Sequence, residues 1–178
     1  MIFITRHGET EWNRLKRFTG NTDIPLNETG LAQARALAER LANVRFAKCY
    51  CSPKLRARQM AEVLFTGAPT LDERLVEIGC GEFEGTAETP EAFRAFMAAM
   101  QDGSQGVEPF RAFLKRNLDF CDVVAAECAV QDILLVTHAA NTRVMNYYFT
   151  GKPADYDFTQ PVCQNGEILI FGGKQCKS

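Results

Sequence analysis

The 178-residue sequence lacks the features that mark several specialised classes of protein. No apolar run approaches the roughly 20 residues that a membrane-spanning helix needs. The first apolar run ends at Arg6, before the core of a signal peptide could form. The formal net charge is only −2, so nothing attracts the whole molecule to nucleic acid or to an anionic membrane. We therefore expect a cytoplasmic protein with no nucleic-acid or membrane partner. Its oligomeric state is left open.

Cysteine is present, but not in a pattern that gives it a specialised role. The number of cysteines is odd, and no pair has the spacing Cys-x-x-Cys. The seven are Cys49, Cys51, Cys80, Cys121, Cys128, Cys163 and Cys176. Such a set disfavours both a disulfide framework and a zinc site. We expect these residues to be structural thiols and expect no bound metal.

The order of the patterns predicts an α/β fold. Apolar strand patterns at 2–5, 46–51 and 132–136 alternate with helical patterns at 27–43, 53–65, 91–100, 107–127 and 142–149. Such alternation favours a three-layer sandwich, with a mostly parallel central sheet and helices on both faces. The length and the 46% hydrophobic content suit one domain over residues 1–178.

Three local features refine this fold prediction. Ser52 is expected to cap the helix that begins with Pro53, because serine suits the cap and proline suits the first helical position. Residues 161–163 and 167–171 are expected to form a hairpin at a sheet edge. A small cap-like segment is expected at about residues 78–108.

Histidine is scarce, and the two that occur have similar surroundings. His7 and His138 each follow a predicted strand and precede polar residues. Ligands of open α/β sheets bind at the carboxyl ends of the strands. Two imidazoles from distant parts of the chain can therefore meet in one crevice.

The first histidine lies in the sequence Arg6-His7-Gly8-Glu9, which suits phosphate chemistry. A neutral imidazole can attack phosphorus and form a covalent intermediate. An adjacent guanidinium gives bidentate donors to phosphate oxygens and keeps the imidazole deprotonated. The glycine permits a close approach of the backbone. Taken alone, an Arg-His pair is more simply explained by a histidine hydrogen-bonded at a strand end.

Four motifs follow one another in the order seen in a known family. They are Arg6-His7-Gly8-Glu9, Ser52-x-x-x-Arg56-Ala57, Glu77 with Gly81-x-x-Glu84-Gly85, and His138-Ala139-x-x-x-Arg143. Together they resemble the histidine phosphatase superfamily, also called the phosphoglycerate mutase-like family, over nearly the whole chain. Ala139 stands where that family often has glycine. Singly, Arg56 also fits a solvated helix face and Glu77 a surface carboxylate.

The resemblance implies a catalytic role for five residues. His7 would accept the phosphoryl group as phosphohistidine, and Arg6, Arg56 and His138 would hold its oxygens. Glu77 would protonate the leaving alcohol and then activate water. No metal or other cofactor is implied, because the arginines supply the positive charge.

The same resemblance implies further contacts to the substrate. The backbone N–H of Ala139 and the side chain of Asn13 are expected to contact the phosphate. Thr19 and Gly20 lie in the sequence Arg17-Phe18-Thr19-Gly20, which follows the first motif, and they are also expected to bind substrate. Arg14 and Lys16 fit both a solvated basic face and an anion-binding mouth.

Within the family, the sequence favours hydrolysis over phosphoryl transfer to a second alcohol. Ile78-Gly79-Cys80-Gly81 stands where mutases carry Arg-x-Tyr-Gly, and residues 86–100 form a short and poorly basic segment. We therefore expect a metal-independent phosphomonoesterase of small phosphorylated metabolites. Phosphoglycerate mutase activity and a non-catalytic phosphate-binding module are the alternatives. α-Ribazole phosphate, sugar phosphates and phosphoglycerates all stay open as substrates.

Overall fold

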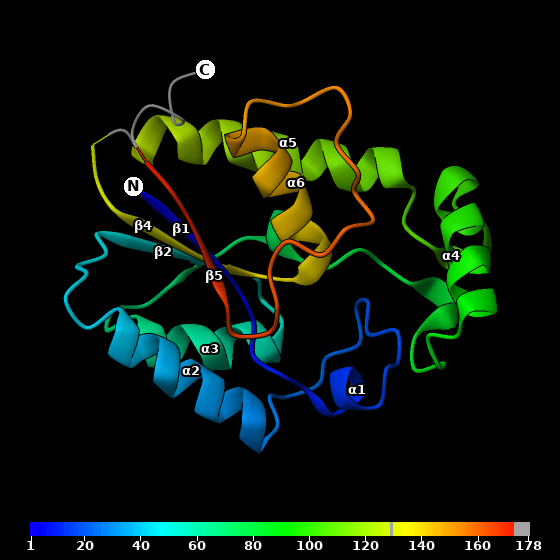
Figure 1. Ribbon diagram of the computed structural model, residues 1–178, viewed down its shortest axis with the longest axis horizontal. Coiled ribbons are helices and arrows are strands. Elements are labelled where there is room, and N and C mark those ends of the chain that lie inside the picture. The colour runs from blue at the N-terminus through cyan, green and yellow to red at the C-terminus, as the bar shows by residue number, and fades with distance from the viewer. Residues whose placement is uncertain (129, 173–178) are drawn as a thin grey trace.

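The computed structural model describes residues 1–128 and 130–172, whose centre is a five-stranded sheet (Figure 1). The strands are β1 (Ile2–Arg6), β2 (Lys48–Cys51), β3 (Thr70–Leu71), β4 (Ile133–Thr137) and β5 (Ile168–Phe171). Their order across the sheet is β3-β2-β4-β1-β5. Strands β1 to β4 pair in parallel, whereas β5 runs antiparallel to β1 at one edge. This confirms the predicted mostly parallel sheet.

Two pairs of helices cover the two faces of the sheet (Figure 1). The pair α2 (Glu28–Arg40) and α3 (Leu55–Leu64) packs on the side of Phe3 and Leu134. The pair α5 (Phe110–Cys128) and α6 (Ala139–Phe149) packs on the side of Ile4 and Leu135. Successive strand residues point to opposite faces, so the continuously apolar strands β1 and β4 need helices on both sides. The predicted three-layer sandwich is confirmed.

A third apolar cluster attaches α4 (Pro90–Asp102) to the rest of the molecule. It joins Phe96 of α4 to Phe113 of α5, to Phe18 in the loop after α1 (Glu11–Arg14) and to Phe83 in a turn of 3-10 helix before α4. Thr89 caps the start of α4 by accepting a hydrogen bond from the N–H of Ala92. In Figure 1, α4 stands at the right, apart from the two helix layers.

The remaining elements are short. They are α1 (Glu11–Arg14) and three turns of 3-10 helix at Glu73–Leu75, Gly81–Phe83 and Ser104–Gly106. No helix in the described part of the chain has the length and apolar character that crossing a bilayer would require.

Two local predictions were wrong. Helix α3 begins at Leu55 with Lys54 at its cap, and the hydroxyl of Ser52 lies 2.8 Å from Nε2 of His138. The predicted strand at residues 161–163 does not form. The N–H of Gly166 binds the carbonyl oxygens of Arg6 and His7, so this segment supports the turn after β1 rather than closing a hairpin.

The cysteines within the described residues are buried: Cys49, Cys51, Cys80, Cys121, Cys128 and Cys163. Burial raises the pKa of the Cys49 thiol to about 12, so that thiol stays protonated at neutral pH. This environment fits the predicted structural role. Cys176 lies outside the described residues.

Candidate active site

Strand pairing brings the two histidines together. Arg6 and Thr137 are opposite one another at the ends of the adjacent parallel strands β1 and β4, and each histidine is the next residue. The backbone N–H of His7 donates to the carbonyl oxygen of Thr137 at 3.0 Å. The two imidazole centroids are 5.1 Å apart, and His7 and His138 are only 3% and 0% exposed. The ends of the two strands therefore bring both rings together, as the sequence predicted.

The hydrogen bonding of His7 defines which of its nitrogens is available. Nδ1 lies 2.7 Å from the carbonyl oxygen of Gly8, which can only accept, so Nδ1 carries the proton. Burial, and then the charges of Arg56 and Arg6, hold the pKa of His7 well below its usual value. The ring is consequently neutral at pH 7, with a free lone pair on Nε2. A nucleophile needs such a lone pair.

The turn that carries His7 packs directly on the start of α2. A Cβ atom on Gly8 would lie 2.5 Å from the carbonyl oxygen of Gly30, and one on Gly30 would lie 2.2 Å from that of Glu9. Real side chains cannot make such contacts, so both positions require glycine. The sequence predicted that Gly8 permits a close approach of the backbone. The group that approaches Gly8 is the backbone of Gly30 at the start of α2.

Asn165, just before β5, supports the same turn from the other side. Its Nδ2 donates to the carbonyl oxygens of His7 at 3.1 Å and Gly8 at 3.3 Å, and to Oδ1 of Asn13 at 3.2 Å. Oδ1 of Asn13 also accepts from the backbone N–H of Thr10. The oxygen of Asn13 is thus occupied, and its NH₂ group is the part available to a ligand. Asn165 was not predicted, because its Asn-Gly sequence indicates only a turn.

Arg56 projects from α3 into the interior and is fully buried. Its Nη1 donates to the carbonyl oxygen of Thr22 at 2.8 Å, and its Nη2 to that of Gly20 at 2.9 Å. This burial excludes the solvated helix face as an explanation of Arg56. The carbonyl of Gly20, a residue predicted to bind substrate, orients this arginine.

Several buried donors near His7 have no protein partner. Among the described residues, these are Nε of Arg6, Arg56 and Arg143 and the hydroxyl of Thr19. Buried polar groups are nearly always hydrogen-bonded, and an unpaired one costs stability. All four side chains line one cavity. Such a concentration of unpaired donors suits an anion. Arg143 belongs to the fourth motif but was not predicted as a site residue.

This cavity, of about 280 Å³, collects eight of the nine predicted site residues on its wall. They are Arg6, His7, Asn13, Thr19, Gly20, Arg56, Glu77 and Ala139. The ninth, His138, lies fully buried beside His7. Burial and the charge of Arg56 hold the pKa of His138 well below its usual value, so this ring is neutral too. Its Nδ1 has no hydrogen-bond partner within the described residues.

Two carboxylates belong to the cavity wall. Glu77 accepts hydrogen bonds from the N–H of Ile78 at 2.9 Å and from that of Ala140, in the first turn of α6, at 3.3 Å. Glu77 is therefore part of the site rather than an isolated surface carboxylate. Glu88, which was not predicted, is largely exposed. Even so, loss of hydration raises its pKa, and the charge of Arg6 acts against this rise.

The two undecided basic residues, Arg14 and Lys16, are not among the residues that line the cavity. Arg14 forms an exposed ion pair with Glu11, one turn before it in α1. We therefore assign neither of them to the phosphate site.

The chain belongs to the histidine phosphatase superfamily (branch 1), whose family model matches residues 2–177. Among its relatives is a metal-independent phosphoserine phosphatase of Arabidopsis thaliana, 33% identical over 81% of this chain and 66% of that protein. Another is a 2,3-bisphosphoglycerate-dependent phosphoglycerate mutase of Gloeobacter violaceus, 31% identical over 80% of this chain and 71% of that protein. The chain thus spans about two thirds of the length of these relatives.

Solved structures agree with this assignment. The α-ribazole phosphatase of Shigella flexneri superposes with a TM-score of 0.81 and 25% identity. The superposition covers 94% of this chain and 87% of that one. The relatives thus include phosphatases and a mutase of one superfamily.

Proposed function

We propose that this protein is a metal-independent phosphomonoesterase that hydrolyses small phosphorylated metabolites through a phosphohistidine at His7. One observation carries the proposal. The bond from Nδ1 of His7 to Gly8 leaves Nε2 as a free nucleophile, in a cavity whose wall includes three arginines and Thr19, each with a buried donor that has no protein partner. These donors match a phosphoryl group, whose charge is spread over several oxygens.

In the first step, Nε2 of His7 attacks phosphorus in line with the leaving oxygen. The P–N bond forms, the P–O bond of the ester breaks, and protonated Glu77 gives its proton to the departing alcohol. Arg6, Arg56 and Arg143 stabilise the charge on the phosphoryl oxygens. Because these cations are fixed in the cavity wall, they provide the positive charge that a metal ion provides in many phosphatases.

In the second step, water replaces the alcohol. Glu77, now a carboxylate, takes a proton from the water, whose oxygen attacks phosphorus. The P–N bond breaks, and inorganic phosphate and neutral His7 are released. Glu77 and His7 line the same cavity, and this position suits Glu77 for both proton transfers.

His138 has a supporting role in this mechanism. We assign the hydroxyl proton of Ser52 to the 2.8 Å bond with Nε2 of His138. The neutral ring then carries its proton on Nδ1, the nitrogen without a protein partner, and can donate it to a phosphoryl oxygen.

The composition of the cavity wall favours hydrolysis over the mutase reaction. A mutase has to retain a bisphosphorylated intermediate, which requires positive charge beyond that used for one phosphoryl group. Residues 78–108 contribute Ile78, Cys80, Glu88, Phe93 and Phe96 to the wall. The one charged residue of this set is acidic. Water should therefore compete successfully for the phosphoenzyme.

The proposal is tested by trapping the intermediate. With ³²P-labelled 4-nitrophenyl phosphate, Glu77→Gln should accumulate labelled protein, because this leaving group needs no proton but water still needs its base. The label should be stable to alkali and released by acid, as expected of phosphohistidine. His7→Ala should take up no label and lose roughly 1000-fold or more in turnover.

Two results would contradict this function. Substantial turnover by the wild type that His7→Ala retains in full would exclude the covalent mechanism. A wild type that binds phosphate but shows no turnover above the His7→Ala background would point to a phosphate-binding module. With 3-phosphoglycerate and 2,3-bisphosphoglycerate, phosphate release should exceed isomerisation. The reverse would show a mutase.

A further inference from the structure

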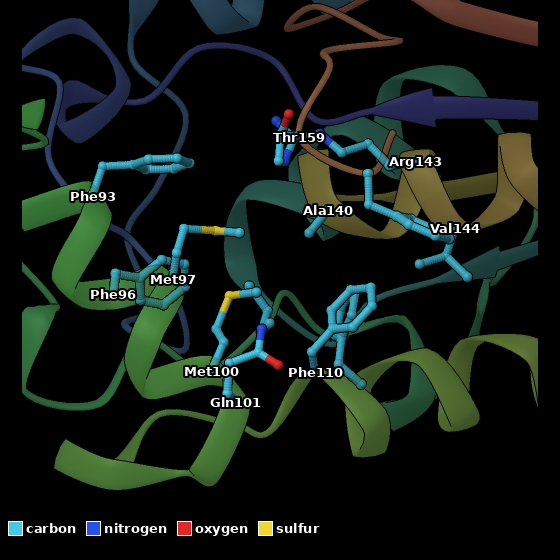
Figure 2. A pocket seen from close by; sticks show the side chains of 13 residues that line it. Phe93, Phe96, Met97, Met100, Gln101, Phe110, Ala140, Arg143, Val144 and Thr159 are labelled. Atoms are coloured by element: carbon cyan, nitrogen blue, oxygen red, sulfur yellow. The ribbon is translucent and has the colours of Figure 1, made fainter. Parts of the chain in front are cut away.

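A second cavity, of about 170 Å³, lies beside the catalytic cavity and has a different character (Figure 2). Ten of the 13 residues that line it are apolar, including Phe93, Phe96 and Met97 of α4 and Phe110 of α5. Figure 2 shows these side chains around a common space, with Ala140 and Val144 of α6 opposite α4. We call this space the apolar cavity.

The apolar cavity is continuous with the phosphate site. Five residues line both spaces, which are Ile78, Phe93, Phe96, Ala140 and Arg143. Arg143 marks the boundary, since it contributes an unpaired buried donor to the phosphate site and also borders the apolar cavity. A molecule whose phosphoryl group contacts the arginines can therefore extend directly into the apolar cavity.

The lining of the apolar cavity is that of a binding site rather than a packing defect. Protein interiors are close-packed, yet here Phe93 is 41% exposed and Met97 and Phe110 are only partly buried. Three polar residues, Gln101, Arg143 and Thr159, complete the wall. Ligand sites typically combine apolar walls with a few such polar groups. Methionine adapts its shape to a ligand more readily than other apolar residues.

We propose that the apolar cavity binds the leaving group, so that the preferred substrates are phosphate monoesters whose alcohol carries one aromatic or similarly compact apolar ring on a short linker. This inference rests on the proposed phosphatase function. An apolar cavity of about 150 Å³ accommodates benzene, so the space here suits one ring. The hydroxyls of a sugar or the carboxylate of a phosphoglycerate would lose their hydration against phenylalanine and methionine without gaining partners.

The test compares two esters that differ only by the ring. The leaving alcohols of 3-phenylpropyl phosphate and propyl phosphate have nearly the same acidity, so a difference in rate reports on binding of the ring. We expect kcat/KM to be at least about 10-fold higher for the phenyl ester, since burial of even one methylene in an enzyme pocket changes kcat/KM by roughly 10-fold or more. The corresponding phosphonates, which cannot be hydrolysed, should show the same order of affinity in calorimetry.

Two variants on α4 locate the effect. Met97→Trp places a bulky ring in the apolar cavity and should lower kcat/KM for the phenyl ester much more than for propyl phosphate, so that the preference is lost. Met97 lines the apolar cavity but not the phosphate site. Ala98→Gln is the matched control, because Ala98 is exposed on the same helix and lines neither cavity. Thermal unfolding of both variants checks the fold.

The outcomes separate this inference from the proposed function. Equal kcat/KM for the two esters, or a preference that survives Met97→Trp, would overturn the inference and leave the phosphatase intact. Hydrolysis of neither ester would overturn the proposed function. In that case the phosphonate pair still decides the inference: tighter, Met97-dependent binding of the phenyl compound supports the apolar cavity, and equal binding rejects it.

Discussion

The contact between Gly8 and Gly30 determines how His7, the proposed nucleophile, is held. The turn after β1 and the first turn of α2 meet through backbone atoms, with no room for a side chain on either. Asn27 caps α2 by accepting a hydrogen bond from the N–H of Gly30, which fixes that side of the contact. His7 therefore takes its position from a helix end that lies more than 20 residues further along the chain.

Replacing Gly8 should accordingly weaken the fold. In Gly8→Ala the new methyl group would press on the backbone of Gly30, and overpacking of this kind costs about 1–3 kcal/mol of unfolding free energy. Urea denaturation of the variant measures this loss. Gly172→Ala is the control, because a Cβ there meets nothing within 4 Å. Equal stability of the two variants would show that the contact is less tight than described.

The residues of the site differ in how readily the sequence reveals them. His7, Arg56 and Glu77 were predicted because they lie in motifs that resemble those of the histidine phosphatase superfamily. Taken singly, Arg56 and Glu77 also fitted a surface position. Ser52 and Asn165 act through hydrogen bonds to distant segments, and no local pattern indicates such partners. Serine before a helix is normally a cap, and Asn-Gly is normally a turn. Both residues were therefore given only a local role. Asn165 does lie in the predicted turn, but its side chain also supports the turn after β1, and Ser52 contacts His138 without capping α3.

At the scale of elements, the loop at residues 19–22 holds the side chain of Arg56 in position. The carbonyl oxygens of Gly20 and Thr22 accept hydrogen bonds from the two terminal nitrogens of the guanidinium. Glu84 fixes this loop by accepting hydrogen bonds from the N–H of Asn21 at 2.8 Å and from the hydroxyl of Thr22. Glu84 is therefore a positioning residue that acts on the phosphate site through Arg56.

This role predicts a loss of activity without loss of a substrate contact. Glu84→Gln replaces one carboxylate oxygen by a donor, so it cannot accept all of the same hydrogen bonds. We expect kcat/KM to fall by about 10-fold, and binding of inorganic phosphate, which also depends on Arg56, to weaken in parallel. Glu82→Gln, at an exposed position of the same 3-10 turn, should behave as wild type. A merely structural role of Glu84 would lower stability while sparing phosphate affinity.

The elements themselves were predicted unevenly. The start of α2 was correct because Asn27 gives a clear cap signal followed by an apolar stripe. Helix α1 was missed because four residues are too few to show a helical period. It is defined by a capping box between Thr10 and Asn13. Strand β5 was predicted at the sheet edge, but the bonds from Asn165 and Gly166 to the turn after β1 replaced the first half of its hairpin.

For the whole molecule, the buried histidines link catalysis to stability. Burial and the nearby arginines hold the pKa values of His7 and His138 well below the usual value of about 6.5, so both stay neutral in the folded state. In the unfolded chain both take up protons as the pH falls below about 6.5. The unfolded state then binds more protons, so the free energy of unfolding falls with decreasing pH. This contribution is complete at neutral pH and is lost on acidification.

The pH dependence of unfolding should therefore change when a histidine is removed. Between pH 6 and pH 5, the wild type should lose about 1 kcal/mol more unfolding free energy than His7→Gln loses. Denaturant titrations at the two pH values measure the difference, and carboxylate titration is common to both proteins. An equal loss in the two proteins would show that His7 becomes protonated in the folded state, against its assignment as a neutral nucleophile.

The central position of β1 has a consequence for the order in which the protein can mature. His7, the proposed nucleophile, follows β1, whose partners β4 and β5 come more than 120 residues later in the sequence. During translation, β1 therefore remains unpaired until β4 has left the ribosome. No partial chain that ends before β4 can have the phosphate site. If the proposed function holds, phosphate turnover in a cell-free synthesis should begin only after β4 has been made, and its onset would time the pairing of β1 with β4.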